Sequence, residues 1–350
     1  MRRRWLLGSG MALGGAAALL VLYPASTGGL APHPNPARTY DEALARIDRL
    51  QRLDGPEVNE VCRVSALTHG RKVAQAIVLL HGYTNCPRQF RLLGERLHAR
   101  GHNVLIPRMP YHGLVDRLTP DLARLTASDL VAYVDAAVDA AAGLGERVTV
   151  AGLSAGGVLS AWAAQTRGDV DRAVLMSPSF APGDVPVPRT QRTMNMATRL
   201  PNLFVWWDKQ RRDRIASELD RYAYPRYSTR AFGEIMRVGL AVMRRAAVEP
   251  PAARSILVIT NLSDTRISGA HTALLVERWR EHGASLETHA FPADRDLIHD
   301  FIDPNQPLQR VEHVYPVLID LLQESGVSSQ ESGAEPRDAA GEGERLDRNY

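Results

Sequence analysis

A serine within a short run of small residues is the feature of this sequence with the clearest chemical potential. Gly152-Leu153-Ser154-Ala155-Gly156 follows an apolar run typical of a β-strand and precedes a predicted helix from Ala155 to about Thr166. In a strand–turn–helix context, this G-x-S-x-G pattern lifts the serine hydroxyl onto a tight bend above a sheet. Glycines are needed because the bend brings backbone segments too close for larger side chains. Ser154 is therefore the candidate nucleophile.

A serine hydroxyl becomes nucleophilic at neutral pH only with a neighbouring base and an orienting carboxylate. With a serine on this kind of turn, the acid and then the histidine follow it along the chain. Asp264 is the candidate acid, because it comes shortly after a predicted strand over Ser255–Thr260. Asp184, after the preceding strand, is the alternative. Either aspartate could instead stabilise a turn.

The candidate base is His299, which lies between the last predicted strand and the last predicted helix. From that loop it can reach back over the edge of the sheet. His289 is the alternative, although it lies inside a predicted strand. The remaining histidines after the candidate acid fall on predicted helices, where a polar surface role is favoured: His271, His282 and His313.

Acyl transfer also needs preorganised N–H donors for the oxyanion of its transition state. One candidate is the backbone N–H of Ala155, directly after the serine. The other is the N–H of Tyr83, in the loop that follows an apolar strand over Ala76–Leu80. His81 in the same loop could be a metal ligand, but no second ligand stands at usable spacing. We interpret it as a histidine packed beneath the loop.

The elements that must position these residues alternate between strand and helix. An early pair of strands is predicted at Val58–Ser65 and Ala76–Leu80. Further strands are predicted at His102–Pro107, Arg147–Leu153, Val170–Met176, Ser255–Thr260 and Leu286–Phe291, and helices at Pro87–Arg100, Ala127–Leu144, Ala270–His282 and Leu308–Gln323. Repeated β-α-β units predict a mostly parallel sheet with helices on both faces.

Together these residues resemble the α/β-hydrolase fold, and most of all its monoacylglycerol-lipase and carboxylesterase-like branch. The resemblance rests on Leu80-His81-Gly82-Tyr83, the serine motif, Asp264 and His299, and on Pro107–Gly113, which is similar to the family's loop after the next strand. It covers about Val58 to Gln323 and implies a hydrolase domain over residues 58–325.

The resemblance implies a serine hydrolase that cleaves carboxylic esters through an acyl-enzyme, without cofactor or metal. Two rivals stay open. An acyltransferase would use the same residues to pass the acyl group to an alcohol or sugar. A binding protein of this fold would not assemble the three side chains at all.

The segment from Ala181 to about Tyr227 interrupts the alternation of strands and helices and matches no pattern of the family. Inserted at the carboxyl edge of the sheet, it would lie above Ser154 and act as a lid. Its aromatic residues could line an acyl-chain pocket or form the lid's own core: Phe204, Trp206 and Trp207.

Two cysteines, Cys62 and Cys86, are too few for a disulfide scaffold. If the two early strands pair as a hairpin, these cysteines come close together. Outside the cytoplasm they could form a disulfide that pins the oxyanion loop. Two unpaired buried thiols are the alternative.

The two ends of the chain differ from the domain between them. Three arginines at positions 2–4 precede an apolar stretch from Trp5 to about Tyr23, which is typical of an export signal. Residues 1–27 are therefore predicted to be a signal peptide or signal anchor, with the catalytic domain outside the cytoplasm. Residues 28–57 are predicted to be a linker and a helix, and residues 326–350 a disordered tail.

The charge pattern bears on partners. The 350 residues carry a formal net charge of +3, with arginines scattered among acids. No sustained basic block with interleaved aromatic residues occurs, so we expect no nucleic-acid partner. The expected substrate is a small-molecule acyl ester or a lipid, with membrane association through the N-terminal segment.

Overall fold

A seven-stranded sheet organises the chain in the computed structural model, which describes residues 27, 29–183, 185–207 and 221–323. The strand order is β1-β3-β2-β4-β5-β8-β9. Strand β1 is antiparallel to its neighbour, and all the other pairings are parallel. The strands are β1 Ser65–Leu67, β2 Val73–Leu80, β3 Asn103–Ile106, β4 Gly145–Leu153, β5 Arg172–Met176, β8 Ser255–Asn261 and β9 Leu286–Phe291.

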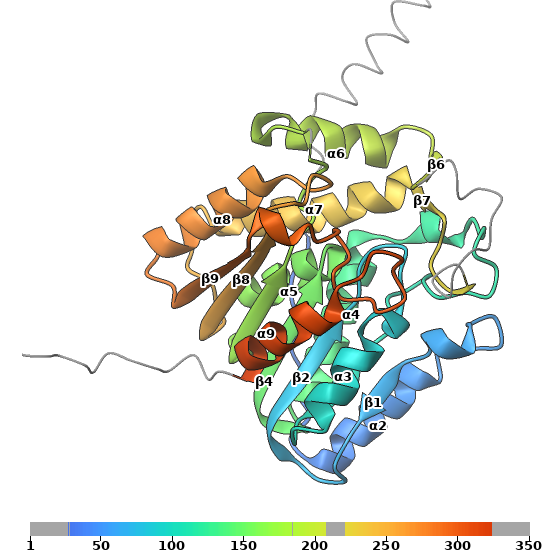
Figure 1. The fold of residues 1–350 in the computed structure, drawn as a ribbon, viewed down its shortest axis with the longest axis vertical. Helices are drawn as coiled ribbons and strands as arrows, with labels where there is room; N and C mark the ends of the chain where they lie inside the picture. The colour runs from blue at the N-terminus through green and yellow to red at the C-terminus, as the bar shows by residue number, and fades with distance from the viewer. Residues whose placement is uncertain (1–26, 28, 184, 208–220, 324–350) are drawn as a thin grey trace, which may run out of the picture.

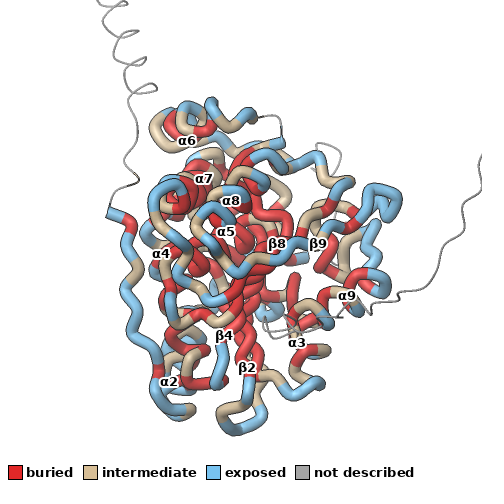
Figure 2. Tube along the Cα trace, turned by 90° about the vertical axis from the view of Figure 1, so that its left-hand side faces the viewer, coloured by how far each residue is buried: buried red, intermediate tan, exposed pale blue. Residues whose placement is uncertain are grey.

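Helices cover both faces of this sheet, as the alternating pattern predicted (Figure 1). On one face Leu93 and Leu318 pack with Ile77 of β2, and on the other Val134 and Leu159 pack with Val78. Because neighbouring residues of β2 point to opposite faces and both are apolar, the strand is buried on both sides. Figure 2 shows β2 and β4 as buried tubes at the centre of the molecule. The helices around the sheet are α2 Tyr40–Gln51, α3 Arg91–His98, α4 Ala127–Ala141, α5 Ala155–Thr166, α8 Gly269–Glu281 and α9 Val311–Gln323, with short 3-10 turns η1 Glu60–Cys62, η2 Pro87–Phe90, η3 Asp121–Arg124 and η7 Ala293–Arg295.

The insertion between β5 and β8 folds over one edge of the sheet (Figure 1). It contains η4 Val187–Arg189, α6 Thr190–Arg199 and the antiparallel pair β6 Phe204–Trp206 and β7 Arg226–Ser228, and it leads into α7 Thr229–Arg245. Helix α7 buries apolar side chains against the core, among them Ile235 and Val238. The insertion is thus anchored through α7, which packs against α4 and α5.

A buried arginine fastens the extended N-terminal segment to the domain. Arg167 pairs with Asp135 at 2.8 Å and with Asp139 at 2.6 Å. The same carboxylates accept backbone N–H groups of the N-terminal segment, from His33 at 2.7 Å and from Asn35 at 3.0 Å. The segment predicted as a linker therefore lies docked along α4.

The ends of the chain fall outside this description. The predicted signal segment, apart from residue 27, and the predicted disordered tail lie outside the described residues. Within the described ranges, no helix has both the length and the apolar character that a membrane span requires.

The prediction of an early strand over Val58–Ser65 is wrong, and so is the hairpin built on it. Only Ser65–Leu67 is extended as β1, and it pairs with β3 instead of β2. Asp54 explains the difference, because its carboxylate accepts the Val64 N–H at 2.6 Å and also pairs with Arg108 at 2.6 Å. The backbone just before β1 is therefore bonded to a side chain instead of to a strand.

Cys62 and Cys86 nevertheless form a disulfide. Two 3-10 turns bring the cysteines together, since Cys62 ends η1 and Cys86 immediately precedes η2. Gly113 packs against this disulfide with a φ of +69°, and a Cβ at this position would collide with Cys62. The bond thus joins two loops on the side of the domain that carries Tyr83, and a third loop packs against it at Gly113.

We expect the native protein to show no free thiol when it is denatured without reductant, and two thiols after reduction. Replacing both residues (Cys62→Ala with Cys86→Ala) should lower the free energy of unfolding by about 3 kcal/mol, because the bond closes a loop with a sequence separation of 24. Urea denaturation of the wild type and the double variant measures the loss. Two free thiols in the unreduced protein would contradict the bond.

Candidate active site

Ser154 sits on a strained turn between β4 and α5. Its φ is 59° and its ψ is −113°, a conformation that side-chain-bearing residues rarely adopt. Two backbone hydrogen bonds hold it there: Ser154 N–H donates to Met176 O at 2.9 Å, and Ser179 N–H donates to Ser154 O at 3.1 Å. The end of β5 and the loop after it therefore hold the strained backbone of Ser154 in place.

The flanking glycines are required by close backbone contacts. A Cβ at Gly152 would collide with the carbonyl of Gly156, and a Cβ at Gly156 would collide with the carbonyl of Leu80. The first contact allows the tight bend, and the second seats α5 against the loop after β2. These two contacts explain why the G-x-S-x-G pattern has glycine at both positions.

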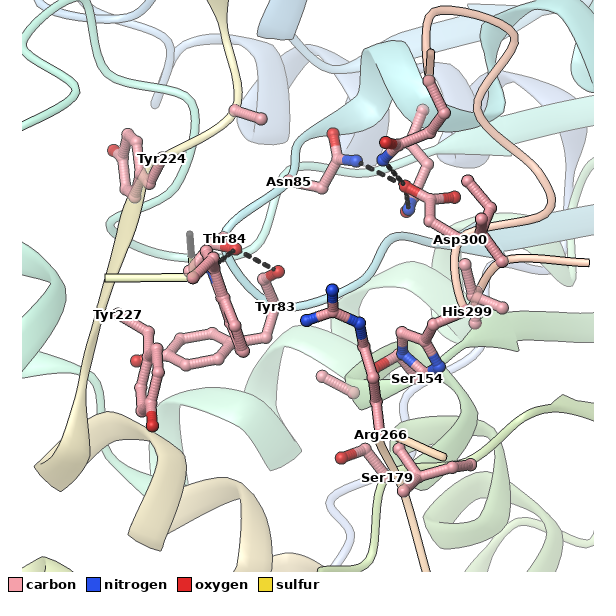
Figure 3. A pocket seen from close by; sticks show the side chains of 18 of the residues that line it. Tyr83, Thr84, Asn85, Ser154, Ser179, Tyr224, Tyr227, Arg266, His299 and Asp300 are labelled. Atoms are coloured by element: carbon pink, nitrogen blue, oxygen red, sulfur yellow. Dashed lines mark hydrogen bonds between the residues drawn. The ribbon is translucent and has the colours of Figure 1, made fainter. Parts of the chain in front are cut away.

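The turn opens into a cavity of about 530 Å³. Ser154 and His299 lie side by side in its wall (Figure 3). Aromatic residues of the insertion and of α7, including Trp207, Tyr227 and Phe232, line another part. The insertion therefore contributes to the wall of the cavity above Ser154.

The histidine beside Ser154 is held by the predicted acid. His299 Nδ1 and Asp264 Oδ2 are 2.5 Å apart, and the Asp264 side chain is only 2 % exposed. Asp264 follows β8 and His299 follows β9, so two neighbouring parallel strands deliver the pair. Because Nδ1–H donates a hydrogen bond to the carboxylate, Nε2 carries the free lone pair of the imidazole. No hydrogen bond joins Ser154 Oγ to this ring among the described residues, a looseness common before substrate binds.

The alternative base is not part of this arrangement. Asp184 lies outside the described residues. His289 lies in β9 with its ring against Phe291, and it does not line the cavity. His271, expected on a polar helix surface, is instead buried, with its ring nitrogens at the hydroxyls of Ser268 and Thr190. The structure thus brings Ser154, Asp264 and His299 together.

Both predicted oxyanion donors line the cavity. The N–H groups of Tyr83 and Ala155 donate no hydrogen bond to any acceptor in the described part of the chain. The neighbouring Gly82 N–H, in contrast, donates to Gln89 Oε1 at 2.7 Å. The Tyr83 donor in this loop and the Ala155 donor at the start of α5 are therefore available to a ligand.

His81 packs beneath this loop, as predicted. Its Nε2 accepts the Met109 N–H at 3.0 Å, so Nδ1 carries the proton and donates to Gly82 O at 2.9 Å. Burial, and to a smaller degree nearby His112, holds the pKa of His81 well below its ordinary value. Burial also lowers the pKa of His112 to about 4. Both rings are neutral structural parts of the site.

An amide bridge between the two site loops was missed in the sequence. Gln89 accepts from Gly82 and donates through Nε2 to Asp300 Oδ2 at 2.8 Å. Asp300 directly follows His299, and its Oδ2 also accepts from Gln306 at 2.8 Å and from Asn85 at 3.2 Å. The bridge thus links the loop that carries Tyr83 to the loop that carries His299. Its only sequence signal is the position of Asp300 beside the candidate base.

The insertion is bonded to the same loop. Tyr83 OH donates to Ser228 O at 2.8 Å and accepts the Ser228 N–H at 3.1 Å. Trp207 Nε1 donates to Thr84 Oγ1 at 2.8 Å. Of the three aromatic residues predicted for the lid, only Trp207 is among the lining residues; Phe204 lies under Arg226 instead.

A parallel sheet with this strained serine turn, an aspartate-bonded histidine and two free N–H groups defines an α/β-hydrolase site. The alpha/beta hydrolase family model matches residues 77–313, more than half of the sequence. The chain belongs to this family.

A lipase relative matches part of the chain. The chain is 32% identical over 94 residues to a thermostable monoacylglycerol lipase of Bacillus sp. (strain H-257). That match covers 27% of this chain and 36% of the relative, so the chain spans about a third of the relative's length.

Solved structures of similar fold include one reported for LipS and LipT, two metagenome-derived lipolytic enzymes, at 17% identity and a TM-score of 0.52, covering 76% of this chain and 98% of that one. The monoacylglycerol lipase of Paleococcus ferrophilus is similar at 15% identity and a TM-score of 0.53, covering 74% and 97%. At these identities the similarity concerns the fold alone.

We expect the buried His112 to make stability depend on pH. In the unfolded chain this imidazole takes up a proton near its ordinary pKa, whereas the folded protein keeps it neutral down to about pH 4. Stability is therefore lost as pH falls through this range. In His112→Asn the amide can still donate to Pro110 O, as Nδ1 does at 2.9 Å. From about pH 7 to about pH 5 the wild type should lose about 2 kcal/mol more free energy of unfolding than the variant.

Urea denaturation at the two pH values measures this difference. Asp303 acts in the opposite sense, because burial and the charge of Asp300 raise its pKa to about 6 and favour the folded, protonated state at lower pH. That contribution is common to both proteins and cancels in the comparison. Equal losses in the wild type and His112→Asn would contradict a neutral buried imidazole.

Proposed function

We propose that this protein is a serine hydrolase that cleaves carboxylic esters through an acyl-enzyme. The observation that carries the proposal is the Asp264–His299 pair beside Ser154 on its strained turn, in the wall of a cavity. Membership of the alpha/beta hydrolase family and the partial match to a monoacylglycerol lipase support ester cleavage.

The proposed reaction uses each group in a defined step. Ser154 Oγ attacks the ester carbonyl while His299 Nε2 takes its proton, and Asp264 orients the ring and stabilises the resulting imidazolium. The N–H groups of Tyr83 and Ala155 hold the tetrahedral oxyanion. His299 then returns the proton to the leaving alcohol. A water molecule, activated in the same way, releases the acid from Ser154.

The cavity wall indicates where an acyl chain would lie. Trp207, Tyr227 and Phe232 present aromatic surface to the cavity. Apolar groups bind such a surface with a free energy roughly proportional to the apolar area that they bury. A lipid or other apolar acyl ester fits this surface. The insertion would thus select substrates by the size of the acyl group.

We also propose that the domain works outside the cytoplasm. The arginines at positions 2–4 and the apolar stretch after them support export. The disulfide between Cys62 and Cys86 supports an oxidising compartment.

Replacing the nucleophile tests the proposal directly. Ser154→Ala should reduce kcat for p-nitrophenyl ester hydrolysis by about a thousandfold or more, because no other group can form the acyl-enzyme. The variant should also fail to react with a fluorophosphonate probe that labels the folded wild type. Ser179→Ala is the matched control, since this serine lines the same cavity but lies outside the strained turn. Retained activity in Ser154→Ala, or an unlabelled wild type, would overturn the assignment and favour a non-catalytic binding protein.

The acid has its own test. Asp264→Asn should lower kcat by about a thousandfold or more while leaving the fold intact, because the amide favours the wrong tautomer of His299. Circular dichroism and urea denaturation check the fold, and ester hydrolysis gives the rate. Activity within tenfold of the wild type would show that Asp264 does not orient the base.

Acyl transfer is distinguished by products. If adding an alcohol raises the consumption of ester while less free acid is formed, the acyl-enzyme reacts with the acceptor in preference to water. Unchanged acid release at saturating acceptor supports hydrolysis.

A further inference from the structure

Arg266 brings a positive charge into the cavity. It is the only arginine or lysine among the described residues that line it. Figure 3 shows its guanidinium extending into the cavity beside Ser154 and His299. Within the described chain, the guanidinium makes no hydrogen bond and no ion pair. Arg266 is exposed, so its guanidinium is hydrated and accessible to a ligand that enters the cavity.

The backbone of Arg266 is held in place. Its N–H donates to Asp264 Oδ1 at 2.9 Å, and its carbonyl accepts the Gly183 N–H at 3.0 Å. The next residue, Ile267, forms a β-bridge with Pro182 at the start of the insertion. The Arg266 side chain therefore extends from a backbone position that is held by the same aspartate that orients His299.

Two described carboxylates near Arg266 are already engaged. Asp264 uses one oxygen for His299 and the other for the N–H of Arg266. Asp300, the only carboxylate among the described lining residues, accepts three side-chain amides on Oδ2 and the Asp303 N–H on Oδ1. Neither of these two described carboxylates is thus free to pair with Arg266, and its guanidinium can bind an anionic group of a ligand.

We propose that the cavity takes esters that also carry an anionic group, a carboxylate or a phosphate, and that Arg266 binds this group. The inference rests on the proposed ester hydrolysis at Ser154 and names the class of substrate. A guanidinium suits both anions, because its planar fork donates two parallel hydrogen bonds to either one. The aromatic wall formed by Trp207, Tyr227 and Phe232 would hold the apolar part of the same substrate.

Matched substrates isolate the charge. In the first pair the anion is on the alcohol side of the ester, and 4-acetoxybenzoate is compared with 4-acetoxybenzamide. In the second pair the anion is on the acyl side, and monoethyl adipate is compared with the ethyl ester of adipic acid monoamide. Each pair differs only in a carboxylate against a neutral amide of similar shape. At about pH 7.5 the carboxylates are ionised. A third acetate, 4-acetoxyphenyl phosphate, decides whether carboxylate or phosphate is the preferred anion.

The wild type should favour the charged member of at least one pair by about tenfold in kcat/KM, as expected for a charge-assisted hydrogen bond. Arg266→Gln should bring that ratio close to one, and Arg266→Lys should keep part of it, because the charge stays while the fork is lost. Arg230→Gln is the matched control. This arginine is exposed on α7, outside the cavity, and its substitution should leave the ratio unchanged.

The outcomes separate the two proposals. An active wild type with equal kcat/KM for both members of both pairs would overturn the anion site alone. So would an Arg266→Gln variant in which both members fall by the same factor, since that result indicates a purely structural arginine. A wild type that cleaves none of these esters and is not labelled at Ser154 by a fluorophosphonate would instead contradict the proposed hydrolysis.

Discussion

The close approach of α5 to the loop after β2 is the constraint on which the site depends. Gly156 lies so near the carbonyl of Leu80 that no side chain fits between them. This contact places the N-terminus of α5 beside the loop that carries Tyr83, and so brings two unpaired N–H groups to one cavity. The strained backbone of Ser154 costs stability of the order of 1–3 kcal/mol, which the surrounding packing must offset.

Parallel topology supplies the other side chains. Strands β4, β8 and β9 all end at one edge of the sheet, so Ser154, Asp264 and His299 converge although they are far apart in the sequence. Asp264 has a double task, because one of its oxygens orients His299 and the other holds the backbone of Arg266. The proposed catalytic and anion-binding groups therefore share one buried carboxylate.

The loop after β2 connects the site to the rest of the molecule. Within a few residues it carries Tyr83, bonded to the insertion at Ser228, and Cys86, bonded to Cys62. Through Gly82 and Gln89 it is also joined to Asp300, next to His299. The disulfide, the insertion and the histidine loop thus all limit the movement of one proposed oxyanion donor.

The sequence by itself determined the features that depend on neighbouring residues. The apolar runs sufficed for the mostly parallel sheet. The G-x-S-x-G turn and the order of serine, acid and histidine led to Ser154 and His299, which line the cavity, and to Asp264, which bonds to His299. Tertiary structure decided what depends on distant partners. Val58–Ser65 did not form the predicted strand because Asp54 and Arg108 bond that region differently. The Gln89–Asp300 bridge and the unpaired guanidinium of Arg266 are likewise invisible in the sequence, because hydrogen bonding between remote segments leaves no local pattern.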